Sequence, residues 1–353
     1  MRYIYLLLDL VTYEAHKTLL IQLKNKNLNV AIADASTSSC FFKKNNKIDW
    51  PDEIFCDIDL KSDDVVIYTK PYISHYSKFW QKKHLSKNVY FAYAPAWAYH
   101  SNSLFECDFF SIIDYVFATS DYDYEGYSNF CAKPKKIIKI EDPRIFEGNE
   151  KIQSSSIESK FDLLWSPHWL TDWYGWPKGY STWLSTVSLV KIYAETNLSK
   201  RICIRPHPMV PLMIESISAK GFYATSPFAQ ALSDWQKLSK LENVFFSNDT
   251  LVNDIILSKR MLTDFSSVAL YAAEFKKEIG LCFHADGPPV SVVGDRIKKF
   301  SADLSEIDAR VRWLFDEGHR RDPVNSLCFN ESVTGMYVFK DKTPVDVFLE
   351  NLS

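Results

Sequence analysis

Three segments of the sequence place polar side chains directly after short apolar runs, where buried strands should end. The first is Arg-Pro-His-Pro, in which Arg205 and His207 follow the apolar run 202–204. Proline cannot continue a hydrogen-bonded strand, so the chain should turn at Pro206. A fixed guanidinium with an imidazole nearby suits an anionic phosphate or a departing phosphate oxygen. Taken alone, a surface turn with an incidental histidine explains this segment equally well.

The second segment is Thr-Asp-Phe-Ser-Ser-Val at residues 263–268, between an apolar run and an apolar helical pattern. It carries Asp264 and the serine pair Ser266 and Ser267. A serine pair at a helix N-terminus offers two hydroxyls and free backbone N–H groups, with the positive end of the helix dipole behind them. Simple N-capping by either serine is the commoner explanation when this segment is taken alone.

The third segment is Trp-Ser-Pro-His at residues 165–168, followed by Ser-Thr-Trp at residues 181–183. It carries Ser166 and His168. An aromatic-rich loop packed for structural reasons would explain this segment by itself. However, ligand sites collect at the carboxyl ends of parallel strands, and all three segments should emerge at that edge of one sheet. Together they favour a ligand site.

The elements that must position these residues alternate between apolar strands and helical spacing along the whole chain. This alternation predicts parallel, doubly wound α/β sheets, and 353 residues favour two domains. We expect a Rossmann-like domain over residues 1–150, a nucleotide-binding domain over 160–335, and a final helix over 336–353 that packs back on the first domain. The polar stretch 147–160 is the best linker candidate. The expected strands cover residues 3–8, 28–33, 64–68, 89–93, 115–119, 136–140, 161–165, 201–204, 243–246, 260–263 and 278–283, and the expected helices cover 13–24, 181–196, 251–257 and 267–275.

Composition excludes several classes of protein. A net charge of -3 gives no electrostatic drive toward nucleic acid. The 7 cysteines form no C-x-x-C pair, so neither a zinc site nor a disulfide framework is expected, and reduced thiols fit best. The apolar run at the N-terminus is too short to span a bilayer. We therefore expect a cytoplasmic protein, with peripheral contact to the inner face of the cell membrane left open.

The order of these motifs resembles the CDP-glycerol glycerophosphotransferase family over about residues 160–285. That family makes teichoic-acid-like and capsule polymers on a GT-B fold, so the resemblance implies two Rossmann-like domains facing across a cleft, with the acceptor side in the N-terminal domain. His-Pro and Ser-Ser pairs also mark CMP-sialic acid and CMP-Kdo transferases. Both groups release CMP, so the shared motifs indicate recognition of cytidine monophosphate more than of one donor.

The resemblance also implies roles for individual residues. His207 would contact the donor phosphate and assist the leaving group, with Arg205 beside it. Asp264 would shape the loop, and His168 would line the same pocket as a second catalytic candidate. The residues implied to bind the donor phosphate or nucleotide are Arg205, Asp264, Ser266, Ser267 and Ser166.

The general base is left open because the sequence departs from the family here. Many members carry Trp-His-Gly in the N-terminal domain, whereas the corresponding stretch 93–100 lacks it and offers His100 as a candidate. A lone histidine in an aromatic loop is more often structural. Asp123 lies in a segment that faintly resembles the acidic base motif of sialyltransferases, although a solvated loop is the safer interpretation. Asp121 and Asp123 have the Asp-x-Asp spacing of metal-dependent transferases but lie in the half away from the donor, so we expect neither a metal nor a cofactor.

Three functions follow from this pattern. In the first, an acceptor hydroxyl attacks the β-phosphorus of CDP-glycerol or a related CDP-alditol, and CMP departs. In the second, the hydroxyl attacks the anomeric carbon of CMP-Kdo or CMP-sialic acid in capsule or lipopolysaccharide synthesis. The third is a non-catalytic nucleotide-binding module, which the missing Trp-His-Gly element supports. The expected acceptor is a polysaccharide, a teichoic-acid-like polymer or a lipid-linked chain.

Overall fold

The structure of the protein is a computed structural model that describes most of the chain. It separates into two compact units: one contains Met1–Ala96, Ser101–Glu147 and Gly335–Ser353, and the other is mainly Gly148–Thr334. The described residues are 1–35, 54–76, 79, 81–94, 108–131, 136–154, 157–168, 181–208, 210, 214, 227–264, 266–284, 301–315, 335–339 and 341–352.

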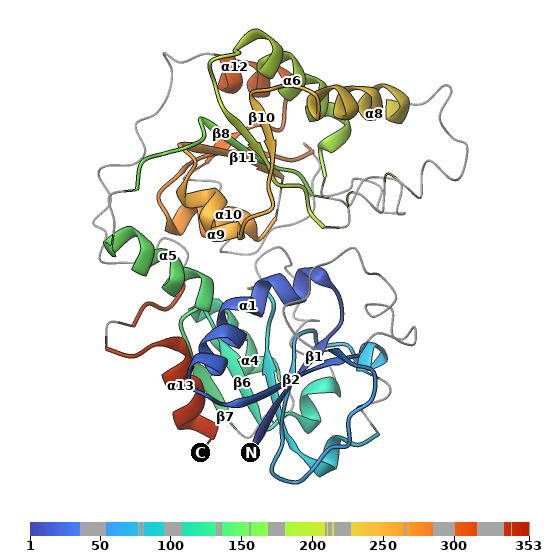
Figure 1. Ribbon diagram of the computed structural model, residues 1–353, viewed down its shortest axis with the longest axis vertical. Helices are drawn as coiled ribbons and strands as arrows, with labels where there is room; N and C mark the ends of the chain where they lie inside the picture. The colour runs from blue at the N-terminus through green and yellow to red at the C-terminus, as the bar shows by residue number, and fades with distance from the viewer. Residues whose placement is uncertain are drawn as a thin grey trace. The chain divides into compact units, whose positions relative to one another are not determined.

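The first unit is built on a seven-stranded parallel sheet in the order β3-β2-β1-β4-β5-β6-β7 (Figure 1). Strand β1 (Arg2–Leu7), which lies between β2 and β4, is buried from Tyr3 to Leu7 because both faces of the sheet are covered. The other strands are β2 (Asn29–Asp34), β3 (Ile54–Phe55), β4 (Val65–Tyr68), β5 (Lys87–Phe91), β6 (Tyr115–Ala118) and β7 (Lys136–Lys139), and the helices are α1 (Leu10–Asn25), α4 (Asp121–Phe130), the first part of α5 (Pro143–Ser154) and α13 (Pro344–Leu352), with short 3-10 turns at Ile73–Tyr76, Lys83–Leu85 and Asp108–Ile112.

The last helix of the chain belongs to this first unit. Phe348 of α13 stacks on Phe117 of β6, with ring centroids 4.9 Å apart, and lies 6.1 Å from the ring of Tyr3. Lys26, at the end of α1, forms an ion pair with Asp346 of α13. The apolar face of α13 therefore completes the core on one side of the N-terminal sheet.

The second unit is built on a six-stranded parallel sheet in the order β10-β9-β8-β11-β12-β13. The strand order reverses between β8 (Leu163–Ser166) and β11 (Arg260–Asp264), which makes their carboxyl ends a topological switch point. Two doubly wound parallel sheets confirm the predicted fold class. The remaining strands are β9 (Ile202–Ile204), β10 (Val244–Phe246), β12 (Glu278–Cys282) and β13 (Ala302–Asp303), and the helices are α6 (Trp183–Thr196), α8 (Pro227–Leu238), α9 (Leu251–Ile256), α10 (Val268–Glu274) and α12 (Ile307–Phe315).

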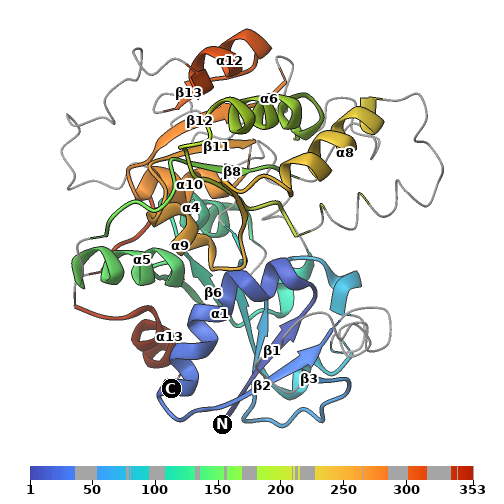
Figure 2. The same cartoon turned by 45° about the horizontal axis from the view of Figure 1, so that its top comes forward.

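An aromatic core holds the helices of the second unit on its sheet. Helices α6 and α8 lie side by side (Figure 2), and Trp235 of α8 packs between Trp165 of β8 and Trp183 of α6, with ring centroids 5.8 Å away in both cases. Trp165 and Trp183 are both buried. The two aromatic segments that flank the predicted site therefore also contribute to the core, because their indole rings fill the space beneath α8.

Two expectations from composition can be compared with the structure. The polar stretch 147–160 was expected to be a linker, and the boundary between the two units falls at its start, between Glu147 and Gly148. Its residues up to Ser154 are helical as part of α5, where Gly148 packs against the ring of Phe275. Cys56 is disulfide-bonded, so the expectation of reduced thiols is wrong for this residue, whereas Cys131, Cys203 and Cys282 are free. In the described part of the chain, no helix combines the length and apolarity needed to cross a bilayer.

Candidate functional site

The strand register of the second unit brings the three polar segments to one edge of the sheet. Thr263 of β11 pairs with Ser166 of β8, and Trp165 of β8 pairs with Ile204 of β9. Asp264, His168 and the Arg-Pro-His-Pro turn therefore follow three neighbouring strands at the same level. This is the carboxyl edge at the switch point, where doubly wound sheets bind their ligands.

Asp264 organises the loops at this edge. Its Oδ1 accepts hydrogen bonds from the Thr182 backbone N–H at 3.0 Å and the Thr182 hydroxyl at 2.6 Å. Its Oδ2 accepts from the backbone N–H of His168 at 2.7 Å and from the Ser181 hydroxyl at 3.3 Å. Burial raises the pKa of Asp264, while the hydrogen bonds from Thr182 and His168 act in the opposite direction. The carboxylate therefore ties the loop after β8 to the start of α6.

Two imidazoles lie against each other at this edge. The rings of His168 and His207 have centroids 5.0 Å apart at an interplanar angle of 55°. The backbone N–H of His207 donates to the Pro167 carbonyl at 3.0 Å, so the Arg-Pro-His-Pro turn is held against the Trp-Ser-Pro-His segment. Burial lowers the pKa of His168 to about 4, so this ring is neutral at pH 7. A neutral imidazole can accept a proton or donate a hydrogen bond to a phosphate oxygen, which are the tasks of acid–base catalysis.

The serine pair precedes α10 but does not cap it through a side chain. Ser267 occupies the N-cap position with helical backbone angles, and its hydroxyl makes no capping hydrogen bond. The backbone carbonyls of Ser266 and Ser267 accept from Ala269 and Leu270 at 3.0 and 3.1 Å. Ser166, by contrast, lies buried at the end of β8, where its carbonyl accepts from the Thr263 hydroxyl. Side-chain capping therefore does not account for Ser267.

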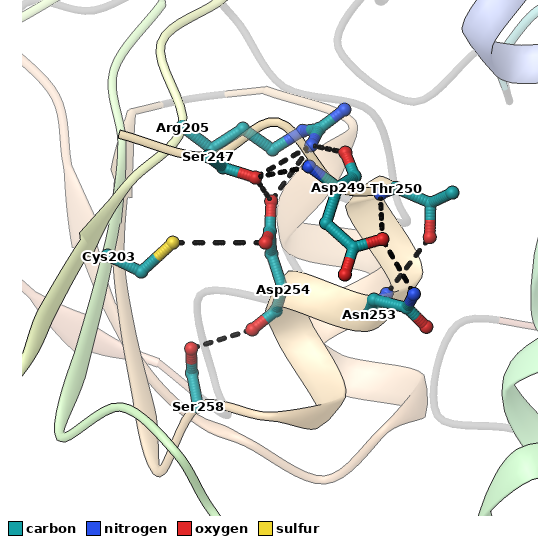
Figure 3. Close-up of polar contacts among 8 residues, drawn as sticks. All are labelled: Cys203, Arg205, Ser247, Asp249, Thr250, Asn253, Asp254 and Ser258. Atoms are coloured by element: carbon teal, nitrogen blue, oxygen red, sulfur yellow. Dashed lines mark hydrogen bonds and ion pairs between the residues drawn. The ribbon is translucent and has the colours of Figure 1, made fainter. Parts of the chain in front are cut away.

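Arg205 is oriented by groups of its own chain, as Figure 3 shows. Its Nη1 forms an ion pair with Asp254 at 2.8 Å and donates to the Asp249 carbonyl at 2.5 Å. Ser247 lies 3.4 Å from the same nitrogen and donates to Asp254. The ion pair with Asp254 could not be read from the motif. Phosphate binding by Arg205 stays a prediction.

Several residues at this edge were missed by the motif analysis. His284 follows β12, and its Nε2 lies 3.2 Å from the Ser181 carbonyl, which makes it the third histidine at these strand ends among the described residues. Arg310 is buried and donates to the Phe283 carbonyl and the Ser185 hydroxyl. The apolar run 278–283 pointed to a strand ending just before His284, and this was the available signal.

The two candidate bases from the N-terminal half of the sequence, His100 and Asp123, are not brought to this edge by any described contact. His100 lies outside the described residues. Asp123 is buried in the first turn of α4 and accepts hydrogen bonds from the hydroxyls of Ser120 and Thr119 at 2.9 and 3.3 Å. The solvated-loop interpretation of this segment is therefore wrong. Within the described ranges, no group of three or more His, Cys, Asp or Glu side chains could hold a metal ion.

Comparison with known proteins supports the fold. A scan against protein-family models and a search of curated proteins gave no match. Among solved structures, the UDP-GlcNAc 2-epimerase of Methanocaldococcus jannaschii in complex with UDP-GlcNAc and UDP is similar, with a TM-score of 0.56 and 10% identity over 99% of each chain. The S. aureus MnaA–UDP co-structure has a TM-score of 0.52 and 11% identity, covering 89% of this chain and 87% of that one. The UDP-N-acetylglucosamine 2-epimerase of Rickettsia bellii has a TM-score of 0.53 and 10% identity, covering 92% and 90%.

At these identities the similarity shows the fold alone. The chain has the GT-B-like arrangement of two parallel-sheet α/β domains, which it shares with enzymes that act on nucleotide sugars.

Proposed function

We propose that the protein is a CMP-releasing transferase that moves glycerol phosphate, or a related alditol phosphate, from a CDP-linked donor to a cell-surface polymer. The observation that carries this proposal is the pair of facing imidazoles, His168 and His207, at the carboxyl ends of neighbouring strands. The Asp264 carboxylate holds the loop after β8 to α6 by accepting hydrogen bonds from the backbone N–H groups of His168 and Thr182. Such an edge is where a doubly wound domain receives a nucleotide.

The proposed chemistry is an in-line displacement at phosphorus. An acceptor hydroxyl attacks the β-phosphorus of the CDP-alditol, the bond from that phosphorus to the bridging oxygen breaks, and CMP carries the bridging oxygen away. His207 donates a hydrogen bond or a proton to the departing phosphate oxygen. Ser266 and Ser267 bind the phosphate with hydroxyls and backbone N–H groups near the N-terminus of α10. The acceptor proton goes to a base that we leave unassigned, with His100 as its candidate.

The acceptor that we propose is a polysaccharide, a teichoic-acid-like polymer or a lipid-linked precursor. Such acceptors are assembled at the cell envelope, so the proposal places the enzyme in the cytoplasm with peripheral contact to the inner face of the membrane. The three polar segments at the ends of β8, β9 and β11 support the proposed nucleotide donor more than the proposed acceptor.

A second candidate is an enzyme that acts on UDP-sugars. The solved structures of similar fold include UDP-GlcNAc 2-epimerases, one of them in complex with UDP-GlcNAc and UDP. The two candidates differ in the nucleotide base and in the bond broken, while the histidine pair could serve both. A third candidate is transfer of a sugar from a CMP-sugar through its anomeric carbon, because this reaction also releases CMP.

The test is nucleotide release by the purified protein across a donor panel. The panel contains CDP-glycerol, CDP-ribitol, CMP-Kdo and CMP-sialic acid, with UDP-GlcNAc and a GDP-sugar as comparisons. The proposal expects CMP release from a CDP-alditol, and loss of that release in His207→Ala. A preference for CMP-sugars would move the enzyme to the sugar-transfer class, and activity confined to UDP-GlcNAc would overturn the cytidine assignment.

A non-catalytic binding module gives a different result in the same assay. It would bind a nucleotide in calorimetry but would neither release nucleotide from any donor nor convert UDP-GlcNAc into its 2-epimer, in the presence or absence of polymer acceptors. This outcome would overturn the transferase proposal while leaving the binding site in place.

A further inference from the structure

Asp254 is a buried carboxylate that the motifs did not point to. It lies in the first turn of α9 with 2% of its surface exposed. Its two oxygens accept from three side chains on two segments of the second unit: the Cys203 thiol of β9 at 3.8 Å and the Arg205 guanidinium just after β9 at 2.8 Å, and the Ser247 hydroxyl that follows β10 at 2.5 Å. One carboxylate therefore joins the carboxyl ends of two neighbouring strands to a helix.

A carboxylate this deeply buried needs a compensating charge, because burying it unpaired would cost several kcal/mol. Arg205 supplies that charge, since its Nη1 lies between the carboxylate of Asp254 and the carbonyl of Asp249. A planar guanidinium held by two oxygens cannot rotate freely about its last bonds. In Figure 3 a second nitrogen of the same group points away from the Asp254 carboxylate. The ion pair therefore fixes the plane of the Arg205 guanidinium.

The same contact fixes the turn that carries His207. The Arg205 N–H donates to the Trp165 carbonyl at 2.9 Å and the His207 N–H to the Pro167 carbonyl at 3.0 Å, so the backbone of the turn is held by β8 and the loop after it. The Arg205 side chain holds the opposite side of the turn to α9. Pro206 between them has a restricted backbone angle, which limits independent movement of its two neighbours.

We infer that Asp254 is a positioning residue of the donor site, which orients Arg205 toward the donor phosphate and steadies the turn that presents His207. This inference rests on the proposed function for the identity of the ligand. Asp254 itself does not touch the donor and acts through Arg205. Ser247 supports it by donating to the same carboxylate.

The test is a double-mutant cycle with a matched control. Asp254→Asn, Arg205→Met and the double variant are compared with Asp234→Asn, which removes another buried charge of the same unit. Asp234 is 2% exposed and pairs with Lys191 at 3.2 Å between α6 and α8. The readouts are the dissociation constant for CMP in calorimetry and the melting temperature of each variant.

We expect Asp254→Asn to weaken CMP binding by about tenfold, and Asp234→Asn to change it by less than about twofold despite a comparable loss of melting temperature. In the Arg205→Met background, Asp254→Asn should add less than about twofold. Wild-type CMP affinity in Asp254→Asn would overturn the inference, as would two full and independent effects in the double variant.

A second readout separates this inference from the proposed function. If the wild-type protein binds no CMP, the cytidine proposal fails, and the NMR resonances of the His207 ring then decide the positioning role. Asp254→Asn and Arg205→Met should both shift those resonances, whereas Asp234→Asn should not. An unshifted His207 ring in Asp254→Asn would overturn the positioning role whatever the ligand is.

Discussion

The carboxylate of Asp264 and the first residues of α6 are joined through Thr182, which donates to one carboxylate oxygen from both its backbone N–H and its hydroxyl, at 3.0 and 2.6 Å. Thr182 occupies the N-cap position of α6, yet its hydroxyl does not cap its own helix. The hydroxyl is used instead to bind the end of β11. The site is thus built on a strand and a helix that lie 82 residues apart in sequence.

Replacing Asp264 should destabilise the second unit. Asp264→Asn keeps one acceptor oxygen but turns an amide N–H₂ toward groups that are themselves donors, so one or more buried donors lose their partner. We expect the free energy of unfolding to fall by about 2 kcal/mol or more in urea denaturation. The matched control is Asp162→Asn, which weakens an ion pair with the exposed Lys259, and its expected loss is below about 1 kcal/mol. Equal stabilities for the two variants would contradict the organising role of Asp264.

The sequence predicts the strand ends of this site well because each is marked by an apolar run that stops at a polar residue. The runs before His168, His207 and Asp264 all end where the register places them side by side. What the sequence could not predict are the partners of the polar groups. Asp254 lies 49 residues from Arg205 and Thr182 lies 82 residues from Asp264, and no local pattern encodes such distances.

The local structure of the linker could not be predicted from composition. Residues 147–160 are poor in apolar side chains, which indicated a linker, and the segment up to Ser154 is helical. Lys151 donates to Asn253 at 2.7 Å, so a polar side chain contributes to holding this helix. Tertiary contacts of this kind override composition. Asp123 was misjudged for the same reason, since its burial depends on the hydroxyls of Thr119 and Ser120.

Removing the His207 imidazole should affect turnover far more than stability. The ring is partly exposed and packs on His168, so His207→Ala leaves no large cavity in the core. We expect the rate of CMP release to fall by about 100-fold or more, the usual contribution of a general acid. The melting temperature should stay within a few degrees of the wild type, measured by circular dichroism. Full transfer activity in this variant would remove His207 from the mechanism.

Ser267 offers a way to separate ligand binding from helix capping. Because its hydroxyl makes no capping hydrogen bond, Ser267→Ala should cost less than about 0.5 kcal/mol of unfolding free energy. Ser120→Ala is the matched control, since the Ser120 hydroxyl accepts from the Asp123 N–H at 3.1 Å and caps α4, and its loss should cost about 1 kcal/mol.

The binding readout should show the reverse order for the two serines. Loss of a hydrogen bond to a charged phosphate should weaken CMP binding by about tenfold in Ser267→Ala. Ser120→Ala should leave the dissociation constant unchanged. If Ser267→Ala binds CMP with the wild-type dissociation constant, the serine pair is not the phosphate site. The proposal that backbone N–H groups at the start of α10 bind the phosphate then loses its main support as well.

Two histidines with lowered pKa values should make the folded protein less stable in acid. Burial lowers the pKa of His16 and of His168 from 6.5 to about 4. The unfolded chain therefore takes up protons on both rings as the pH falls below 6.5, while the folded chain resists until the pH nears 4. The unfolded state binds more protons in this window. The free energy of unfolding must therefore decrease as the pH is lowered, by about 1 kcal/mol per pH unit for each histidine.

His16 allows this dependence to be measured away from the donor site. Its ring is buried in the first unit, with Nδ1 3.0 Å from the Thr12 carbonyl. His16→Gln should lose one histidine's share of the pH slope in urea denaturation between pH 6.5 and 4.5. The raised pKa of Asp264 acts in the opposite direction but cancels when variant and wild type are compared at each pH. Equal slopes in His16→Gln and the wild type would show that burial does not lower the pKa of His16 in the folded protein.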